Sequence, residues 1–457
     1  MECLSFDLSS DNMAFRELSP SVFRAIERSL DLGHFNRPLL QNLRELISNQ
    51  GSSGVSLRDM CIFLGPRLKR LCLIPPASLD GLEIFVAALK ARCLAIDDLS
   101  ISLHDDPGRA NRIVTDLICS LSSLRELSCE DVACDSRTLT HLSYLPSLQY
   151  LTVRLPKRLA GECFLDSSSN ILPFIAMRYL RISVASIADA GEFLQVVSSS
   201  SGLEFLHISL EDPILPTPEK IHAVFTIMQR SSFCDTLTTF GLWDYAEFHE
   251  NTPPVHSLDA HTLSPLLQCR NLERVTINLS YNYAAVDNPL LQEIASAWPC
   301  LRDISLHARY KARLWHSKAN LQGLSYLAQH CHSLRSVGLQ FDVSLPATGV
   351  YPDKGIHYES LIELHVCRSH VSDPLALATF LAEVFPNLKL YHYFMGWSPD
   401  EKSPEYIEMG ARWNDVVQML EARRQELSQS LTNPNVRISS TIKTITHEIS
   451  KLISKSP

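Results

Sequence analysis

The chain has 457 residues, 45% of them hydrophobic and 20% charged, and its formal net charge is −9. This acidic balance does not favour binding to nucleic acid, and we expect no nucleic-acid partner. No apolar run approaches roughly 18 residues, the length of a membrane-spanning helix. The first residues, MECLSFDLSSD, lack the basic and apolar regions of a signal peptide. We therefore expect neither a membrane span nor secretion.

One short pattern, apolar-x-x-apolar-x-apolar, recurs along nearly the whole chain, at steps of 24 to 35 residues. Alternate side chains of a strand point to opposite faces. Each copy therefore predicts a short strand with positions 4 and 6 on one face and positions 3, 5 and 7 on the other. The intervals are long enough for the crossover helix that parallel neighbouring strands require. The copies begin at Leu43, Leu68, Ile96, Leu124, Leu148, Met177, Leu203, Leu237, Leu272, Leu301, Leu334, Leu361 and Leu388.

A second position repeats in step with the first. Eleven of the thirteen residues that stand three places before a copy are apolar, aromatic or Cys, and Gly65 and Ser200 are the exceptions. A residue at this position would fill the corner where a helix gives way to a strand, and we call these positions the corner residues. They are Leu40, Gly65, Cys93, Leu121, Leu145, Phe174, Ser200, Cys234, Cys269, Trp298, Cys331, Tyr358 and Phe385.

One strand and one helix cannot bury their own apolar side, so stacked neighbours must complete the core. The pattern and its period are typical of leucine-rich repeats. We predict an α/β leucine-rich-repeat solenoid, a horseshoe with a parallel β-sheet on its concave face and helices on its convex face. About 13 repeats would occupy residues 43–394, after an N-terminal helical segment in residues 1–42 that leads into the first repeat.

Two further segments follow the repeats. Residues 395–428 predict a C-terminal capping helix region, because the end of a solenoid otherwise exposes its apolar core. Residues 429–457 form a polar tail that we expect to be disordered or a marginal helix; its weakly basic apolar stripe could instead touch a partner or a membrane surface. The apolar side chains expected to cover the last repeat are Ile407, Trp413, Val416, Val417 and Leu420.

Several phrases of the chain are similar to those of fungal F-box/leucine-rich-repeat proteins. They are SPSVFRAIE (residues 19–27), RPLLQNLREL (37–46), GPRLKRLCL (65–73) and GARWNDVVQML (410–420). In that family the F-box binds Skp1 within a ubiquitin ligase, and the repeats hold the protein to be ubiquitylated. A recognisable F-box is absent here. Residues 15–40 resemble only the opening of that module and would be at most a degenerate F-box.

This resemblance implies that the chain is the substrate receptor of an F-box-type (SCF) ubiquitin ligase, with Skp1 as a partner if the degenerate F-box is functional. The alternative is a stand-alone leucine-rich-repeat scaffold or inhibitor that recruits no ubiquitin ligase. Both functions are protein–protein recognition, in which the repeats position a partner. We therefore predict no enzyme and no catalytic residue.

The partner-binding surface should lie on the concave face, where positions 3, 5 and 7 point. Its first part would carry acids, and its middle would carry large aromatic side chains and arginines. These residue types are frequent in protein-binding hot spots, although exposed Tyr, Thr and Arg are also common strand formers. We predict a partner segment with apolar anchors and acidic groups, contacted by Tyr150, Arg154, Tyr179, Arg181, Phe205, His207, Trp243 and Arg274.

Two long loops are a second candidate for recognition. Residues 244–262 and 340–357 lengthen their repeats with Pro, Asp and His. Loops on a rigid scaffold often carry recognition, but an insertion in a surface loop also costs little free energy. We favour the interpretation as tolerated insertions.

The sequence predicts no cofactor and no metal. It has no phosphate-binding loop, no HExxH and no GxSxG elbow. The triplet His330-Cys331-His332 could suggest a metal site, but Cys331 is a corner residue that would point inward. Thirteen cysteines without a CxxC pair favour reduced structural thiols and a cytoplasmic or nuclear location.

Overall fold

The structure is a computed structural model in which the chain divides into two compact units. The first comprises Met1–His249 and His261–Ser280, and the second comprises Glu250–Ala260 and Tyr281–Pro457. The residues that the structure describes are 3–7, 39–49, 57–74, 81–103, 107–157, 172–200, 202–212, 214–244, 256–307, 317–343, 357–366, 369–391 and 404–432.

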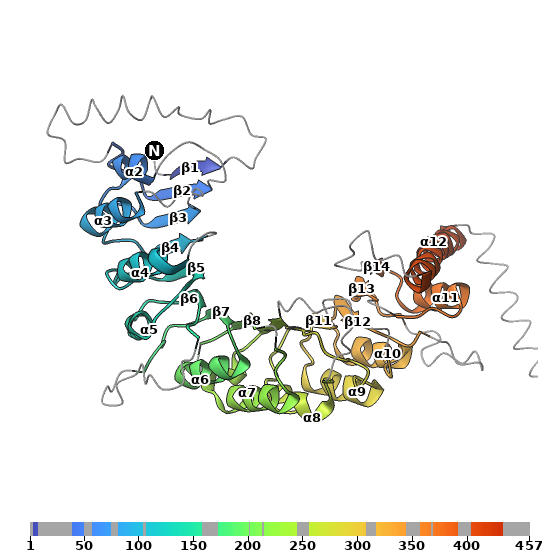
Figure 1. The fold of residues 1–457 in the computed structure, drawn as a ribbon. Coiled ribbons are helices and arrows are strands. Elements are labelled where there is room, and N and C mark those ends of the chain that lie inside the picture. The colour runs from blue at the N-terminus through green and yellow to red at the C-terminus, as the bar shows by residue number, and fades with distance from the viewer. Residues whose placement is uncertain are drawn as a thin grey trace, which may run out of the picture. The chain divides into compact units, whose positions relative to one another are not determined.

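In the first unit every strand pairs in parallel with the next strand of the chain. Helices α2 to α5 lie on one side of these strands (Figure 1). The strands are β1 (Cys3–Asp7), β2 (Glu45–Asn49), β3 (Arg70–Ile74), β4 (Asp98–Ile101), β5 (Glu126–Ala133), β6 (Tyr150–Arg154), β7 (Tyr179–Val184), β8 (Phe205–Leu210), β9 (Thr239–Asp244) and β10 (Arg274–Asn278). The helices are α2 (Leu57–Met60), α3 (Leu82–Arg92), α4 (Pro107–Ile118), α5 (Ser136–Ser143), α6 (Ile187–Val197), α7 (Pro218–Arg230) and α8 (Ala260–Leu263), with short 3-10 turns η1 (Cys61–Phe63), η2 (Ser232–Asp235) and η3 (Leu266–Gln268).

The second unit repeats the same arrangement, with parallel pairing from β11 to β14 in chain order. Its strands are β11 (Asp303–Leu306), β12 (Ser336–Leu339), β13 (Glu363–His365) and β14 (Lys389–Tyr391). Its helices are α9 (Asn288–Ala297), α10 (Leu321–His330), α11 (Pro374–Val384) and α12 (Pro404–Thr432). Among the described residues, no helix is both long enough and apolar enough to cross a membrane.

This topology confirms the predicted α/β leucine-rich-repeat solenoid. Strands β2 to β13 begin at position 3 of the repeated pattern, whereas β14 begins one residue earlier, at position 2 of the copy at Leu388. In β3, Leu71 and Leu73 are buried at positions 4 and 6, whereas Arg70 at position 3 is exposed. Burying a leucine completely contributes about 1.5–3 kcal/mol. We call the face that carries positions 3, 5 and 7 the open face of the sheet.

The helices complete the core with apolar stripes, and several of them start at side-chain caps. In α3, Phe85 and Leu89 are fully buried beneath the sheet. Asp135 caps α5 by accepting a hydrogen bond from the amide of Thr138, and Ser186 forms a capping box with Asp189 at the start of α6. Each cap satisfies amides that the first turn leaves without a partner, and such caps are worth about 1 kcal/mol.

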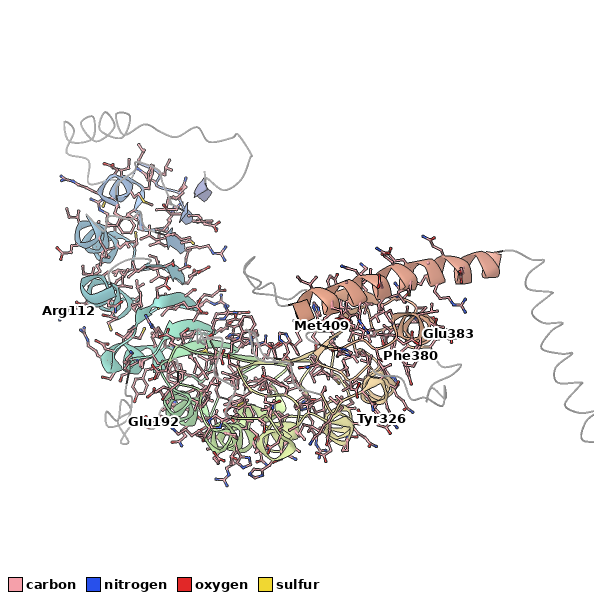
Figure 2. The ribbon with its side chains drawn as sticks, turned by 45° about the vertical axis from the view of Figure 1, so that its right-hand side comes forward. Arg112, Glu192, Tyr326, Phe380, Glu383 and Met409 are labelled. Carbon is pink, nitrogen blue, oxygen red and sulfur yellow. The ribbon has the colours of Figure 1, made fainter. Side chains whose placement is uncertain are left out.

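The C-terminal helix α12 packs along α11, where Figure 2 labels Phe380 and Glu383. Trp413 is completely buried and donates its indole N–H to the carbonyl of Ser369 at 2.8 Å. Val416 and Leu420 are buried beside it, but Ile407 is 54% exposed and Met409 is buried. The expectation that Ile407 covers the last repeat is wrong, because the helical stripe that faces α11 begins two residues later.

The N-terminal residues also differ from expectation. Cys3–Asp7, which the sequence analysis assigned to a helical segment, form β1, and β1 pairs in parallel with β2. Residues 1–6, MECLSF, fit the repeated pattern with apolar residues at positions 1, 4 and 6, but they begin 42 residues before the copy at Leu43, outside the steps of 24 to 35 residues that define the series. Residues 8–38, which include most of the F-box-like phrase, lie outside the described residues.

Candidate functional site

The open face of β6, β7 and β8 carries a continuous row of aromatic rings. The parallel register places Tyr150 beside Tyr179, and Tyr179 beside Phe205. The first two ring centroids are 5.8 Å apart, and the second two are 3.9 Å apart with planes inclined by 8°. Neighbouring strands lie about 4.8 Å apart, so rings at one register position are brought within stacking distance. Tyr150 remains 42% exposed at the edge of the row.

His207 is the buried centre of this face. It occupies position 5 of β8, an open-face position, yet it is only 7% exposed. The explanation is Gly241, its register neighbour in β9. A Cβ atom at position 241 would lie 2.4 Å from Nδ1 of His207, so the imidazole fills the space that the glycine leaves. Trp243 then packs edge-on against the imidazole, with centroids 5.0 Å apart.

Burial and charge keep this imidazole neutral. Desolvation, assisted by the positive charge of Arg181, lowers the pKa of His207 to about 4. The cause is general, since a buried site disfavours the charged form of histidine. Near neutral pH the imidazole of His207 is therefore an uncharged aromatic ring, and it adds no positive charge to that of the neighbouring Arg181.

Arg154 is not available to a partner in the way its sequence position suggested. Its Nε donates to Oε2 of Glu211 at 2.8 Å, and its Nη2 donates to the same oxygen. The ion pair extends from Arg154 in β6 to Glu211, the residue after β8. It passes over β7 and β8, where Ser183 and Ser209 lie at the same register position as Arg154 and are both buried. Glu211 was not among the predicted residues, because 57 residues separate it from Arg154 in the sequence.

The two remaining arginines of the predicted set differ in their surroundings. Arg181 is half-buried beside His207, and among the described residues its Nε has no hydrogen-bond partner and no carboxylate forms an ion pair with it. Arg274 is exposed at position 3 of β10. Of the predicted cations, Arg181 is therefore the one that lies next to the aromatic row without an acidic partner in the described part of the chain.

We define the aromatic face as Tyr150, Tyr179, Arg181, Phe205, His207 and Trp243. All six residues belong to the predicted set, and the structure brings them together on β6 to β9. The two other predicted residues lie at its edges: Arg154 is held in an ion pair, and Arg274 lies one strand further along.

The acids expected on the first strands are partly neutralised. Arg70 donates to Oε1 of Glu45 at 3.1 Å and also contacts Asp98, so it bridges β2 and β4. These two hydrogen bonds, with the charges of both acids, raise the pKa of Arg70. Glu126 and Glu130 on β5 remain half-buried next to the aromatic row. The open face therefore changes from ion-paired and polar to aromatic between β5 and β6.

The other sequence candidates are weaker. Asp244, at the start of the loop 244–262, is 1% exposed and accepts from the amide of Ser280 at 2.6 Å, which is a structural role. Residues 245–255 and 344–356 of the two loops lie outside the described residues. Cys331 is buried with its Sγ 3.4 Å from the carbonyl of Trp298, so it points away from its flanking histidines. No group of three or more potential metal ligands occurs among the described residues.

Comparison with known proteins gives weak likenesses. No protein-family model matches the chain, and no curated protein matches it. Among solved structures, the leucine-rich repeat-containing protein LegL7 from Legionella pneumophila is similar with a TM-score of 0.35 and 10% identity, over 81% of this chain and 96% of that one. The TLR13–ssRNA13 complex is similar with a TM-score of 0.34 and 16% identity, over 77% of this chain and 51% of that one. The site described above depends on the geometry of this chain alone.

Proposed function

We propose that this chain is a protein-recognition module and that its aromatic face binds an extended partner segment with apolar anchors and acidic groups. The observation that carries the proposal is the row of Tyr150, Tyr179 and Phe205 on the open face, in which Tyr179 and Phe205 stack, beside an Arg181 that has no acidic partner among the described residues. Large aromatic rings and arginine are the residue types on which binding energy most often concentrates.

The rings are already ordered before a partner arrives. Tyr179 and Phe205 stack on each other, and both are half-exposed, so each keeps apolar surface available. A side chain that is fixed by its neighbours loses less conformational entropy when it binds, and more of its contact energy appears as affinity. An apolar side chain of the partner that covers this row would add to an existing stack.

The charges on this face favour an acidic partner segment. Arg181 presents a guanidinium fork, a donor suited to carboxylates, and His207 beside it is neutral near pH 7. Arg274 is a second arginine on this sheet, on β10, the strand after the one that carries Trp243. Binding should therefore weaken as ionic strength rises, because exposed charges are screened over about 8 Å at physiological salt.

A peptide selection tests this proposal directly. Random peptides displayed on phage would be selected on the full chain, and the enriched sequences would be made as free peptides. We expect them to combine aromatic or branched apolar residues with Asp or Glu. The variant Tyr179→Ala/Arg181→Ala/Phe205→Ala should weaken their binding at least about 30-fold, the loss expected when hot-spot residues are removed.

The matched control is Ser128→Ala/Thr276→Ala, two open-face positions on the flanking strands β5 and β10. This control should bind the peptides as the unmodified chain does. The proposal fails if the peptides bind equally well to a folded triple variant, or if the enriched peptides are basic.

We consider two forms that the cellular role of this protein recognition can take. The substrate receptor of an F-box-type ubiquitin ligase is favoured by the resemblance of residues 19–27, 37–46, 65–73 and 410–420 to fungal F-box/leucine-rich-repeat proteins. A stand-alone scaffold is favoured by the incomplete F-box-like opening. Mixing the full chain with purified Skp1 separates them, because a stable complex is required by the first form and excluded by the second. Peptide binding to the aromatic face is expected in both.

A further inference from the structure

The corner residues of consecutive repeats stack on one another, and at one step both are cysteines. Cys234 lies in η2, and Cys269 directly follows η3 in the next repeat. No other pair of consecutive corner residues in the sequence consists of two cysteines. Both side chains are buried, with exposures of 6% for Cys234 and 0% for Cys269.

Two other buried corner cysteines donate hydrogen bonds from their thiols to the backbone of the preceding repeat. The thiol of Cys93 donates to the carbonyl of Gly65 at 3.3 Å, and that of Cys331 donates to the carbonyl of Trp298 at 3.4 Å. In both cases the acceptor belongs to the corner residue one repeat earlier. The thiol of Cys269 instead meets the thiol of Cys234, with a distance of 2.7 Å between the two sulfur atoms.

This distance distinguishes the pair from ordinary packed thiols. Heavy atoms in van der Waals contact are about 3.5–4.0 Å apart, and the two sulfurs of a disulfide are about 2.05 Å apart. The sulfurs of Cys234 and Cys269 lie between these limits. A small approach of the two short turns that carry them would bring the atoms to bonding distance.

We propose that Cys234 and Cys269 are a site of reversible oxidation, at which a hydroperoxide joins two neighbouring repeats by a disulfide. The sulfur of Cys234, as thiolate, attacks one oxygen of hydrogen peroxide and the O–O bond breaks, which gives a sulfenic acid and hydroxide. The hydroxide takes up the proton that the Cys234 thiol had released and becomes the first water. The sulfur of Cys269 then attacks the sulfur of Cys234, the S–O bond breaks, and the hydroxyl group leaves with the proton of the Cys269 thiol as the second water. The two thiols lose two protons and two electrons, and the peroxide is reduced to two waters.

Cys234 is assigned the first step for two reasons. It is the more exposed of the pair. The hydrogen bond from Cys269 lowers the pKa of the Cys234 thiol although burial acts in the opposite direction, whereas the same contact and burial raise the pKa of Cys269. The thiolate is the reactive form of cysteine, so Cys234 attacks and Cys269 resolves.

The sequence allows an unambiguous measurement by mass spectrometry. Trypsin releases residues 231–270 as one peptide, because Arg270 is its only Lys or Arg, and this peptide contains only the two cysteines in question. The reduced full chain would be treated with hydrogen peroxide, quenched with catalase, denatured, alkylated with iodoacetamide and digested. We expect a peptide that carries no alkyl group and is two hydrogen atoms lighter than the reduced one. Dithiothreitol before alkylation should restore two alkylated cysteines.

Two other peptides control for access and for nonspecific oxidation. Cys300 is exposed and is the only cysteine of the tryptic peptide 275–302, so its reaction shows that the oxidant was active. Cys93 is a buried corner cysteine whose neighbouring corners are Gly65 and Leu121, and it should remain fully alkylated. The proposal is overturned if the peptide 231–270 keeps two alkylated cysteines while Cys300 reacts, or if its cysteines are converted only to sulfinic or sulfonic acids.

A stability measurement gives a second, independent result. The disulfide would close the 35-residue interval that contains β9 and Trp243. A loop of that length predicts an upward shift of about 5 °C in the thermal unfolding midpoint of the oxidised full chain. Cys269→Ala removes the resolving sulfur and should abolish both the light peptide and this shift. An equal shift in the oxidised Cys269→Ala protein would overturn the assignment to this pair.

Discussion

The open faces of β2 to β5 and of β6 to β9 share one backbone arrangement and carry different chemistry. On the first, Arg70 bridges Glu45 and Asp98, and position 5 holds small residues such as Ser100. On the second, position 3 holds three neighbouring aromatic rings and position 5 holds Arg181 and His207. The parallel register is the same in both regions, so the difference arises from the side chains alone.

The strand positions that hold the repeat scaffold together differ from the positions that form the candidate binding site. Positions 4 and 6 are buried in both regions and are apolar except for Ser48 in β2, and they determine that the chain folds as a repeat array. Positions 3 and 5 vary between ion pairs, small residues and aromatic rings, and most of their side chains are partly exposed. A recognition site can therefore be placed on any repeat of such a sheet without a change of backbone.

The largest expected effect tests whether the scaffold is equivalent in the two regions. Leu127→Ala in β5 and Leu180→Ala in β7 each remove a buried position-4 side chain. Each should lower the free energy of unfolding of the first unit by about 2–5 kcal/mol, measured by urea denaturation of the full chain. If the losses in free energy of unfolding caused by the two substitutions differ by more than about 2 kcal/mol, the two regions are not packed alike.

A substitution at Gly241 should affect the aromatic region specifically. Gly241→Ala places a methyl group within 2.4 Å of the His207 ring, so the ring must move and the free energy of unfolding should fall by about 1–3 kcal/mol. Gly202→Ala is the matched control, because its Cβ would meet only the carbonyl of Met177 at 3.6 Å. Adding His207→Ala to Gly241→Ala should recover part of the lost free energy of unfolding, because the clashing ring is removed. If the double variant is no more stable than Gly241→Ala alone, the proposed clash is contradicted.

The buried imidazole predicts a pH dependence that the first region lacks. The pKa of His207 is about 4 in the folded chain, below the ordinary value of about 6.5 in the unfolded chain. Between these values the unfolded state binds more protons, so stability is fully present above about pH 6.5 and falls as the pH drops toward 4.

The size of this loss should be on the order of 2 kcal/mol, and urea denaturation at pH 7.5 and pH 5 would measure it. His207→Gln should reduce the difference between the two pH values. If the variant and the unmodified chain lose equal stability, the pH dependence comes from other groups.

The smallest expected effect concerns the ion pair at the edge of the aromatic face. Glu211→Gln should lower the free energy of unfolding by about 1 kcal/mol, because Arg154 and Glu211 are only partly exposed. Asp116→Asn, which breaks the well-exposed pair with Arg137, should cost less than about 0.5 kcal/mol. Similar costs for the two substitutions would show that burial adds nothing to the Arg154–Glu211 pair.

The sequence was sufficient for features that depend on local periodicity. It predicted the strands, the inward leucines, the buried corner residues such as Trp298 and Cys331, and the positions on the open face where Tyr150, Tyr179 and Phe205 lie. The prediction omitted β1 although MECLSF fits the pattern, because the 42 residues from Met1 to the copy at Leu43 exceed the steps of 24 to 35 residues in the series. It also misplaced Ile407, because the rotation of α12 on α11 depends on which side chains fit the neighbouring helix.

What the sequence determined by itself is therefore the repeat: its period, its faces and the types of residue on each. Only the tertiary structure decided which of those residues act together. The ion pair of Arg154 with Glu211, the burial of His207 against Gly241 and the contact of Cys234 with Cys269 join residues that are 34 to 57 positions apart. The physical reason is that the pattern determines where each strand lies within its own repeat, whereas contacts between repeats depend on register and on the space that a neighbour leaves.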